Sequence, residues 1–282
     1  MPNMLLDPVV ATVVAAAVGL CVGSFLNVVI YRLPKILERG WQAQCADMRG
    51  EVVPEQPRYN LAVPRSACPG CGHQITMVEN IPVVSWLALR GKCSACATRI
   101  SVRYPIVELL GGALAAAAIF KFGPTWQGVA ACALLWTLLA LTAIDFDTQL
   151  LPDNLTLPLL WGGLIANLYG LFVPLTDAVI GAIAGYLALW TIFWLFKLIR
   201  GKEGMGYGDF KLLAALGAWL GWKMLPLIVL GSSVVGACIG IALVVFKGRD
   251  HNVPLAFGPY LAIAGAIALF FGPSILRLYF PG

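Results

Sequence analysis

The chain alternates long apolar stretches with short polar breaks, and it holds one long polar segment near its start. The first apolar stretch, residues 9–31, is long enough to cross a bilayer, which takes roughly 20 helical residues. Further apolar stretches, separated by Gly and Pro residues, cover 104–120, 126–144, 155–172, 177–198, 209–221, 224–246 and 255–271. The pattern predicts an all-α polytopic membrane protein with about eight transmembrane helices.

One of these stretches, 209–221, is short for a span of roughly 20 residues. A short apolar helix fits a bilayer when it tilts, when flanking side chains reach the interface, or when it merges with the next helix. We expect one of these arrangements here.

Composition supports a membrane setting. The chain is 60% hydrophobic and 12% charged, whereas soluble proteins have about 45–50% apolar and about 25% charged residues. The start of the chain lacks a basic segment, Asp7 precedes the apolar run, and that run is too long for the core of a signal peptide. Residues 9–31 are therefore predicted to be the first membrane helix.

The net charge of +5 matters less than its distribution. Lys and Arg concentrate in 32–103, 197–211 and 247–249, and the positive-inside rule places these segments on the cytoplasmic side. No basic run is dense enough to indicate nucleic-acid binding. The predicted organisation is a first transmembrane helix (1–33), a cytoplasmic domain (34–103) and a seven-helix membrane domain (104–282), with both termini on the other side.

Four cysteines of the polar segment have the spacing C-x2-C-x21-C-x2-C: Cys68, Cys71, Cys93 and Cys96. Two such knuckles offer Zn²⁺ a closed tetrahedral site with no open position for catalysis, close to a zinc ribbon. Disulfides or a redox CxxC are the alternatives, but a reducing cytoplasm argues against structural disulfides. His73 follows the first knuckle and is a substitute ligand.

Acidic residues mark the ends of two apolar stretches. The helix that ends at Asp145 is predicted to run toward the cytoplasmic side, and the helix that begins at Asp209 runs away from it. Both carboxylates then lie on the same face of the membrane. Paired carboxylates suit an aspartyl protease, in which an ionised one activates water and a protonated one polarises the carbonyl.

Helix capping is the alternative reading of these acidic residues, because Asp is a common N-cap. Asp209 and Asp153 each precede an apolar stretch and fit that role. Glycines 204, 206 and 208 favour a functional reading of Asp209, since they permit close approach of an extended substrate. Lys211 either tunes such a carboxylate pair or anchors the helix at the interface.

Other hydrolytic chemistries find no support in the sequence. It contains no HExxH, no G-x-S-x-G and no P-loop motif, and its only histidines are His73 and His251. A serine or metal-dependent intramembrane protease is therefore not expected.

Several motifs resemble one known family. They are Gly206-Tyr-Gly-Asp209, a GxGD motif; the segment 144–153, Ile-Asp-Phe-Asp-Thr-Gln-Leu-Leu-Pro-Asp; the segment 23–34; and the run from Cys68 through Asn80-Ile-Pro and Gly91-Lys-Cys to Glu108. Over nearly its full length the chain resembles bacterial type IV prepilin peptidases. These are bifunctional leader peptidases and N-methyltransferases of type IV pilus and type II secretion systems.

The resemblance implies specific roles and partners. Asp145 and Asp209 would be the catalytic pair, with Asp147 as the competing assignment for the first position. The cysteine quartet matches the family's zinc-binding cytoplasmic domain. Prepilins and pseudopilins would be cleaved after the Gly that ends a basic leader, and the new N-terminal residue methylated from S-adenosylmethionine, for which the sequence shows no binding motif. The family works in the inner membrane, with its active site and zinc domain on the cytoplasmic face.

A non-enzymatic membrane scaffold or carrier with a zinc ribbon is the rival interpretation. In that case the Asp residues only cap helices, and no chemistry depends on their pairing. The sequence does not indicate the oligomeric state.

Overall fold

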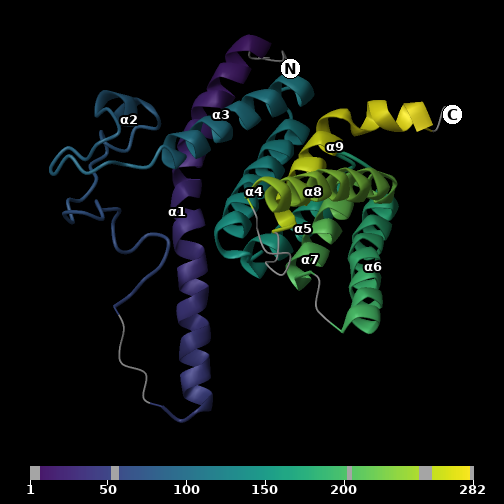
Figure 1. The fold of residues 1–282 in the computed structure, drawn as a ribbon. Helices are drawn as coiled ribbons and strands as arrows, with labels where there is room; N and C mark the ends of the chain where they lie inside the picture. Colours follow the sequence, from purple (N-terminus) through teal and green to yellow (C-terminus); the bar gives the residue numbers. More distant parts are fainter. Residues whose placement is uncertain (1–6, 52–56, 202–204, 248–255, 280–282) are drawn as a thin grey trace. The chain divides into compact units, whose positions relative to one another are not determined.

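The computed structural model describes residues 7–51, 57–201, 205–247 and 256–279, and the regular elements in these ranges are helices. They are α1 (Pro8–Met48), α2 (Val84–Ala88), α3 (Arg103–Phe122), α4 (Trp126–Thr148), α5 (Asp153–Leu168), α6 (Leu175–Arg200), α7 (Tyr207–Leu220), the 3-10 helix η1 (Trp222–Met224), α8 (Leu225–Lys247) and α9 (Gly258–Tyr279) (Figure 1). The all-α prediction is confirmed.

Six helical segments among the described residues are long and apolar enough to cross a membrane: α1, α3, α4, α6, α8 with η1, and α9. They mark the chain as a multi-pass membrane protein. Helices α5 and α7, with 16 and 14 residues, are shorter than a span of roughly 20 residues. The predicted count of about eight spans therefore stays a prediction, although each predicted stretch contains a helix.

Helix α1 is longer than its apolar pattern indicated. Its predicted end near Tyr31 is wrong, because the helix continues through Pro34 to Met48. Proline removes one backbone hydrogen bond without necessarily ending a helix, and residues 35–48 are rich in good helix formers such as Leu, Glu, Arg, Gln and Ala. Thus 34–48, predicted to begin the cytoplasmic domain, extends the first helix.

The chain divides into two compact units, Met1–Pro124 and Thr125–Gly282. In the first unit α1 and α3 lie side by side (Figure 1). Glycines make this approach possible, since a Cβ atom added to Gly23 would lie 2.6 Å from the Cα of Glu108. Below this contact, the buried Arg32 donates a hydrogen bond to the carbonyl of Asn60 over 3.0 Å, and Arg39 stacks on the Tyr59 ring 4.2 Å from its centroid.

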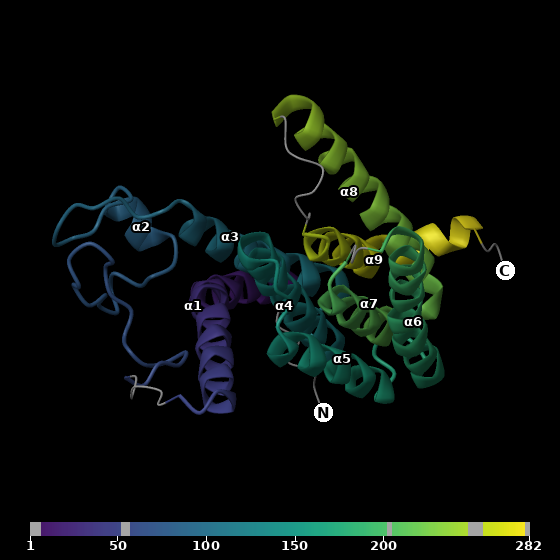
Figure 2. The same cartoon turned by 60° about the horizontal axis from the view of Figure 1, so that its bottom comes forward.

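In the second unit the short helix α7 forms the core. Every residue from Asp209 to Leu220 except Lys211 is buried. Helices α5, α6 and α9 all pack on α7, and Figure 2 shows α7 between α5 and α6. Gly181 of α6 and Gly217 of α7 meet backbone to backbone, which leaves no room for a side chain at either position. These small residues therefore serve helix packing.

The buried side chain of Asn167 fixes the far end of α7. Its amide group donates to the carbonyls of Ala218, over 2.7 Å, and Trp219, over 3.1 Å, while its oxygen accepts from the N–H groups of Phe172 and Val173. The side chain thus satisfies orphan carbonyls at the end of α7 and the turn after α5. The other end of α7, which carries Asp209, is held differently.

Candidate active site and metal centre

Two helix ends in the second unit carry the predicted catalytic carboxylates. Asp145 lies in the last turn of α4 and is 4% exposed, and Asp209 lies in the first turn of α7 and is 7% exposed. The two groups are close enough for the charge of Asp145 to act on Asp209. Two buried carboxylates from separate helices thus lie near enough to interact electrostatically.

Leu151, in the connection between α4 and α5, contacts the residues next to both carboxylates. A Cβ atom on Gly208 would lie 2.6 Å from the Cβ of Leu151, and a Cβ on Gly258 would lie 3.1 Å from its methyl groups. The leucine side chain is therefore packed between the start of α7 and the start of α9. This packing brings three helix ends together at the carboxylates.

Gly258, the first residue of α9, is a site residue that the sequence reasoning missed. A Cβ atom there would lie 2.6 Å from Oδ2 of Asp145, closer than side-chain carbons approach an oxygen. The available signal was the Phe257-Gly-Pro259 sequence at a helix start, which places a residue without a side chain where a new helix begins. The glycine leaves the space that the Asp145 carboxylate occupies.

The same carboxylate is incompletely bonded. Oδ2 of Asp145 is buried and has no hydrogen-bond partner among the described residues. Leaving a buried polar atom unpaired is costly, so native proteins keep such atoms chiefly where they serve a purpose such as catalysis. This environment makes Asp145 a candidate for a functional carboxylate.

The competing position, Asp147, lies in a different environment. Its side chain is exposed, whereas Asp145, two residues earlier and on another side of the helix, is buried. Burial favours Asp145 as the partner of Asp209.

The structure gives the capping interpretation little support. The N-cap residues of α5 and α7 are Pro152 and Gly206, and neither helix has a side-chain capping hydrogen bond. Asp153 and Asp209 lie instead in the first turns, where a negative charge interacts favourably with the helix dipole. Lys211 binds Asp153 through hydrogen bonds of 2.6 and 2.8 Å, which joins α7 to the start of α5. Gly204, the first glycine before Asp209, lies outside the described residues.

The four knuckle cysteines converge in the first unit, and all their sulfurs lie within 4.8 Å of one another. Cys68 and Cys96 sulfurs are 3.7 Å apart, and those of Cys71 and Cys93 are 4.0 Å apart. A tetrahedron with metal–sulfur bonds of about 2.3 Å has sulfur–sulfur edges of about 3.8 Å. All four cysteines are free thiols. The quartet therefore fits a metal ion such as zinc.

Both knuckles are built by the same local fold. Antiparallel bridges, Ala67 with Gln74 and Lys92 with Arg99, close each pair of cysteines into a tight turn. The residue after each second cysteine has a left-handed backbone, with φ of +73° at Gly72 and +57° at Ala97. This turn aims two sulfurs of each knuckle at one point.

Electrostatics in the quartet favours a bound cation. The neighbouring Thr98 hydroxyl, 3.1 Å from the Cys96 sulfur, lowers the pKa of that thiol to about 6. The pKa of Cys71 is raised to about 12: the His73 backbone N–H acts to lower it, but the Cys96 sulfur and other nearby sulfurs oppose it. Four close thiols cannot all ionise alone, and a bound metal ion removes that repulsion.

His73, the substitute ligand, has another partner. Its Nε2 atom lies 3.2 Å and 3.3 Å from the two carboxylate oxygens of Glu79. Hydrogen bonds from Ser94 and then Thr76 hold the pKa of Glu79 well below its ordinary range, at about 2, so its side chain is a carboxylate. Sequence reasoning did not single out Glu79.

Comparison with known proteins places the chain in a family. Residues 17–122 match the model of the bacterial peptidase A24 N-terminal domain, and residues 132–241 match that of the type IV leader peptidase family. The chain is 59% identical over 264 residues to a protein of Aeromonas salmonicida (strain A449) named prepilin leader peptidase/N-methyltransferase, covering 93% of this chain and 91% of that protein. The chain belongs to the type IV leader peptidase family.

Other relatives with the same name share this similarity. A Pseudomonas aeruginosa protein is 58% identical over 262 residues, covering 93% of this chain and 90% of its own length, and one from Burkholderia pseudomallei (strain 1026b) is 56% identical over 268 residues, covering 94% and 86%. No solved structure matches the chain. The first matched region contains the cysteine quartet, and the leader-peptidase region contains Asp145 and Asp209.

Proposed function

We propose that this protein removes the leader peptide from type IV prepilins and type II secretion pseudopilins, and then methylates the new N-terminal residue. The supporting observation is the identity of 56–59% with relatives that are named prepilin leader peptidase/N-methyltransferase, over more than nine-tenths of the chain. Nothing in the comparisons supports the non-enzymatic scaffold.

Asp145 and Asp209 are the proposed catalytic pair. The ionised carboxylate takes a proton from a water molecule, whose oxygen attacks the scissile carbonyl carbon. The protonated carboxylic acid gives its proton to the carbonyl oxygen, which forms a tetrahedral diol. The carboxyl that took the proton of water then gives it to the amide nitrogen, and the other carboxylate takes a proton from a diol hydroxyl. The C–N bond breaks, and each carboxyl is back in its starting state. The unpaired Oδ2 of Asp145 is the proposed acceptor for the proton of water.

The proposal also includes a methyl donor and a metal ion. S-adenosylmethionine would supply the methyl group when it is bound, and no residue is assigned to hold it. Zinc would be held by Cys68, Cys71, Cys93 and Cys96 in a closed, structural site, because four thiolates leave no open coordination position.

The proposed location is the inner membrane, with the cysteine quartet and both carboxylates on the cytoplasmic side. This orientation follows from the concentration of Lys and Arg in 32–103 and 197–211. A prepilin keeps its basic leader in the cytoplasm and its apolar helix in the bilayer, so its scissile bond would meet the carboxylates at the membrane edge.

Incubation of the purified protein in detergent with a prepilin tests this proposal. Wild type is expected to release the leader, and Asp145→Asn and Asp209→Asn variants are expected to leave it uncut, while Asp147→Asn cleaves normally. Retained cleavage by the Asp209→Asn variant would overturn the aspartyl mechanism. Absence of cleavage by wild type, with purified, folded and zinc-loaded protein, would favour the scaffold.

A further inference from the structure

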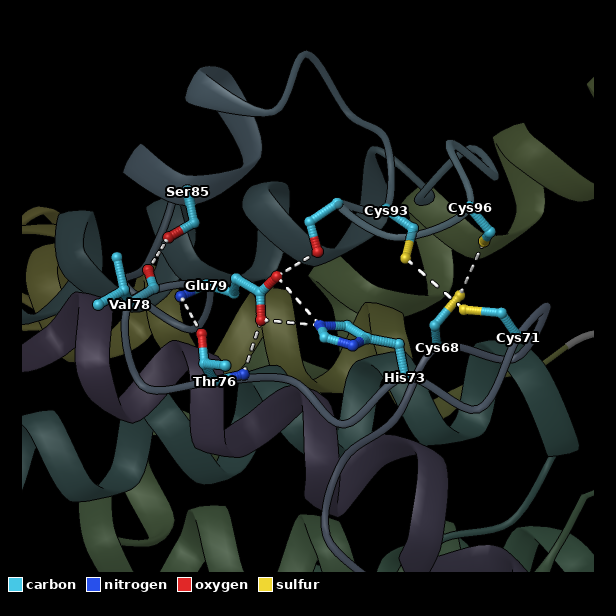
Figure 3. Close-up of polar contacts among 10 residues, drawn as sticks. Cys68, Cys71, His73, Thr76, Val78, Glu79, Ser85, Cys93 and Cys96 are labelled. Carbon is cyan, nitrogen blue, oxygen red and sulfur yellow. Dashed lines mark hydrogen bonds and ion pairs between the residues drawn. The ribbon is translucent and has the colours of Figure 1, made fainter.

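Glu79 lies between the two cysteine knuckles and bonds to both (Figure 3). On one side, its carboxylate contacts Nε2 of His73, two residues after Cys71. On the other side it accepts a hydrogen bond from the hydroxyl of Ser94, the residue after Cys93. A third bond, 2.8 Å long, comes from the N–H of Thr76. One side chain thus reaches residues beside a cysteine of each knuckle.

The remaining hydrogen bonds of the knuckles are local. In the first knuckle the N–H of Cys68 bonds the carbonyl of His73, and in the second the N–H of Cys93 bonds the carbonyl of Thr98. Apart from contacts among the sulfurs themselves, the hydrogen bonds found between segments 66–75 and 91–100 in the described structure pass through Glu79. Each turn is therefore shaped by its own hydrogen bonds, and Glu79 links the two turns, which also pack directly where Gly70 lies against Thr98.

The chemistry explains why a carboxylate suits this position. Three donors point at Glu79, from Thr76, Ser94 and His73, and an ionised carboxylate has enough lone pairs to accept from all of them. An amide of the same shape turns one of its two groups into a donor and cannot satisfy the same partners. Hydrogen bonds to a charged group are also roughly twice as strong as neutral ones.

We propose that Glu79 is the positioning residue of the metal centre, and that it holds the two knuckles at the separation a metal ion requires. The inference rests on the proposed zinc site. Glu79 does not touch the metal or its sulfurs; it acts through His73 and Ser94. Groups that orient the surroundings of metal ligands typically contribute about 10–100-fold to metal affinity.

The rate of zinc loss from the full-length protein in detergent tests the role. Zinc transfer to a chromogenic chelator is followed for wild type, Glu79→Ala and Glu79→Gln. Glu51→Gln is the matched control, because Glu51 is an exposed carboxylate whose ion pair in the described part of the chain is with Arg49, outside the knuckles. Both Glu79 variants are expected to release zinc about 10-fold or more faster than wild type. The Glu51 control is expected to match wild type.

A second readout separates metal geometry from general loosening. Co²⁺ replaces zinc, and its ligand-field absorption reports whether four sulfurs surround it tetrahedrally. We expect Glu79→Ala to change this spectrum. The milder Ser94→Ala variant removes one arm of the contact, so we expect it to release zinc at an intermediate rate even if Glu79→Ala does not fold.

The outcomes distinguish the two proposals. If wild type binds no zinc, the zinc site itself is wrong. If wild type binds zinc but both Glu79 variants and Ser94→Ala release it at the wild-type rate, the role of Glu79 is overturned and the zinc site stands. If the Glu51→Gln control also releases zinc faster, the effect comes from losing a negative charge anywhere in the domain. That result would also overturn the role of Glu79.

Discussion

The cysteine quartet of the first unit and the carboxylate pair of the second are built in opposite ways. The cysteines lie on tight turns near the surface, and the hydrogen bonds around Glu79 are satisfied. The carboxylates lie in a buried core of helix ends, and Oδ2 of Asp145 has no partner among the described residues. A structural site gains from satisfied bonds, whereas a site proposed to transfer protons needs an atom available to accept one.

Among the changes considered, replacing either carboxylate should have the largest effect on leader cleavage. Asp145→Asn and Asp209→Asn are expected to lower leader cleavage by at least about 100-fold, because general acid–base catalysis supplies factors of this size. Methylation of a pilin supplied already cleaved is expected to continue, which shows that the protein is folded. Gel analysis measures leader removal, and incorporation of the methyl group measures methylation. A similar loss with Asp147→Asn would count against the burial argument.

Gly258→Ala should have the next largest effect. The added Cβ would crowd Oδ2 of Asp145, and misplacing a reacting group by about 1 Å can cost about 100-fold in rate. We expect kcat to fall about 10–100-fold with little change in KM, because the added methyl group displaces the carboxylate rather than the substrate. Gly231→Ala is the matched control, since its Cβ would make an ordinary 3.8 Å contact with Ala264. Equal kcat values for the two variants would refute the steric role.

Removing the metal should affect the first unit and largely spare the second. A strong chelator, or Cys68→Ser, is expected to expose segment 66–100 to protease, because the metal holds the two knuckles together. Some leader cleavage is expected to remain, since a closed four-thiolate site performs no chemistry. Limited proteolysis and leader cleavage are measured on the same sample. Complete loss of cleavage with an intact proteolytic pattern would contradict a structural metal.

The ion pair between Lys211 and Asp153 should matter least. Both side chains are partly exposed, and such pairs contribute about 0–1 kcal/mol. Lys211→Met and Asp153→Asn are each expected to shift the melting temperature slightly and to leave cleavage nearly unchanged. A double-mutant cycle on thermal unfolding measures the coupling. Strong loss of cleavage with Lys211→Met would show that the lysine tunes the carboxylates instead.

The same contrast explains what the sequence could predict. The quartet was found from spacing alone, because two cysteines of each knuckle are neighbours in the chain and the turns are local. The resemblance to prepilin peptidases, carried by motifs around Cys68 and Asp209, is confirmed by the family models and relatives. Helices were found from apolar runs, since a bilayer demands them.

What the sequence did not reveal depends on packing between distant segments. Gly258 and Leu151 matter only because the ends of three helices lie close together. No local sequence pattern predicts this arrangement. Glu79 lies in an ordinary turn, residues 77–80, and its contacts with His73 and Ser94 appear only once both knuckles have folded. The end of α1 escapes sequence analysis for a different reason: an apolar stretch marks where a helix leaves lipid rather than where the helix stops.

The length of α1 has a mechanical consequence. Residues 32–48 continue the helix about 25 Å past its apolar stretch, at 1.5 Å per residue. Yet the returning chain is fastened near the base of this extension, where Arg32 binds Asn60 and Arg39 stacks on Tyr59. The tip of α1 therefore projects beyond these contacts. The segment that carries the cysteine quartet is thus attached to α1 at Arg32 and Arg39, and to α3 by the hydrogen bond from the N–H of Val83 to Glu108.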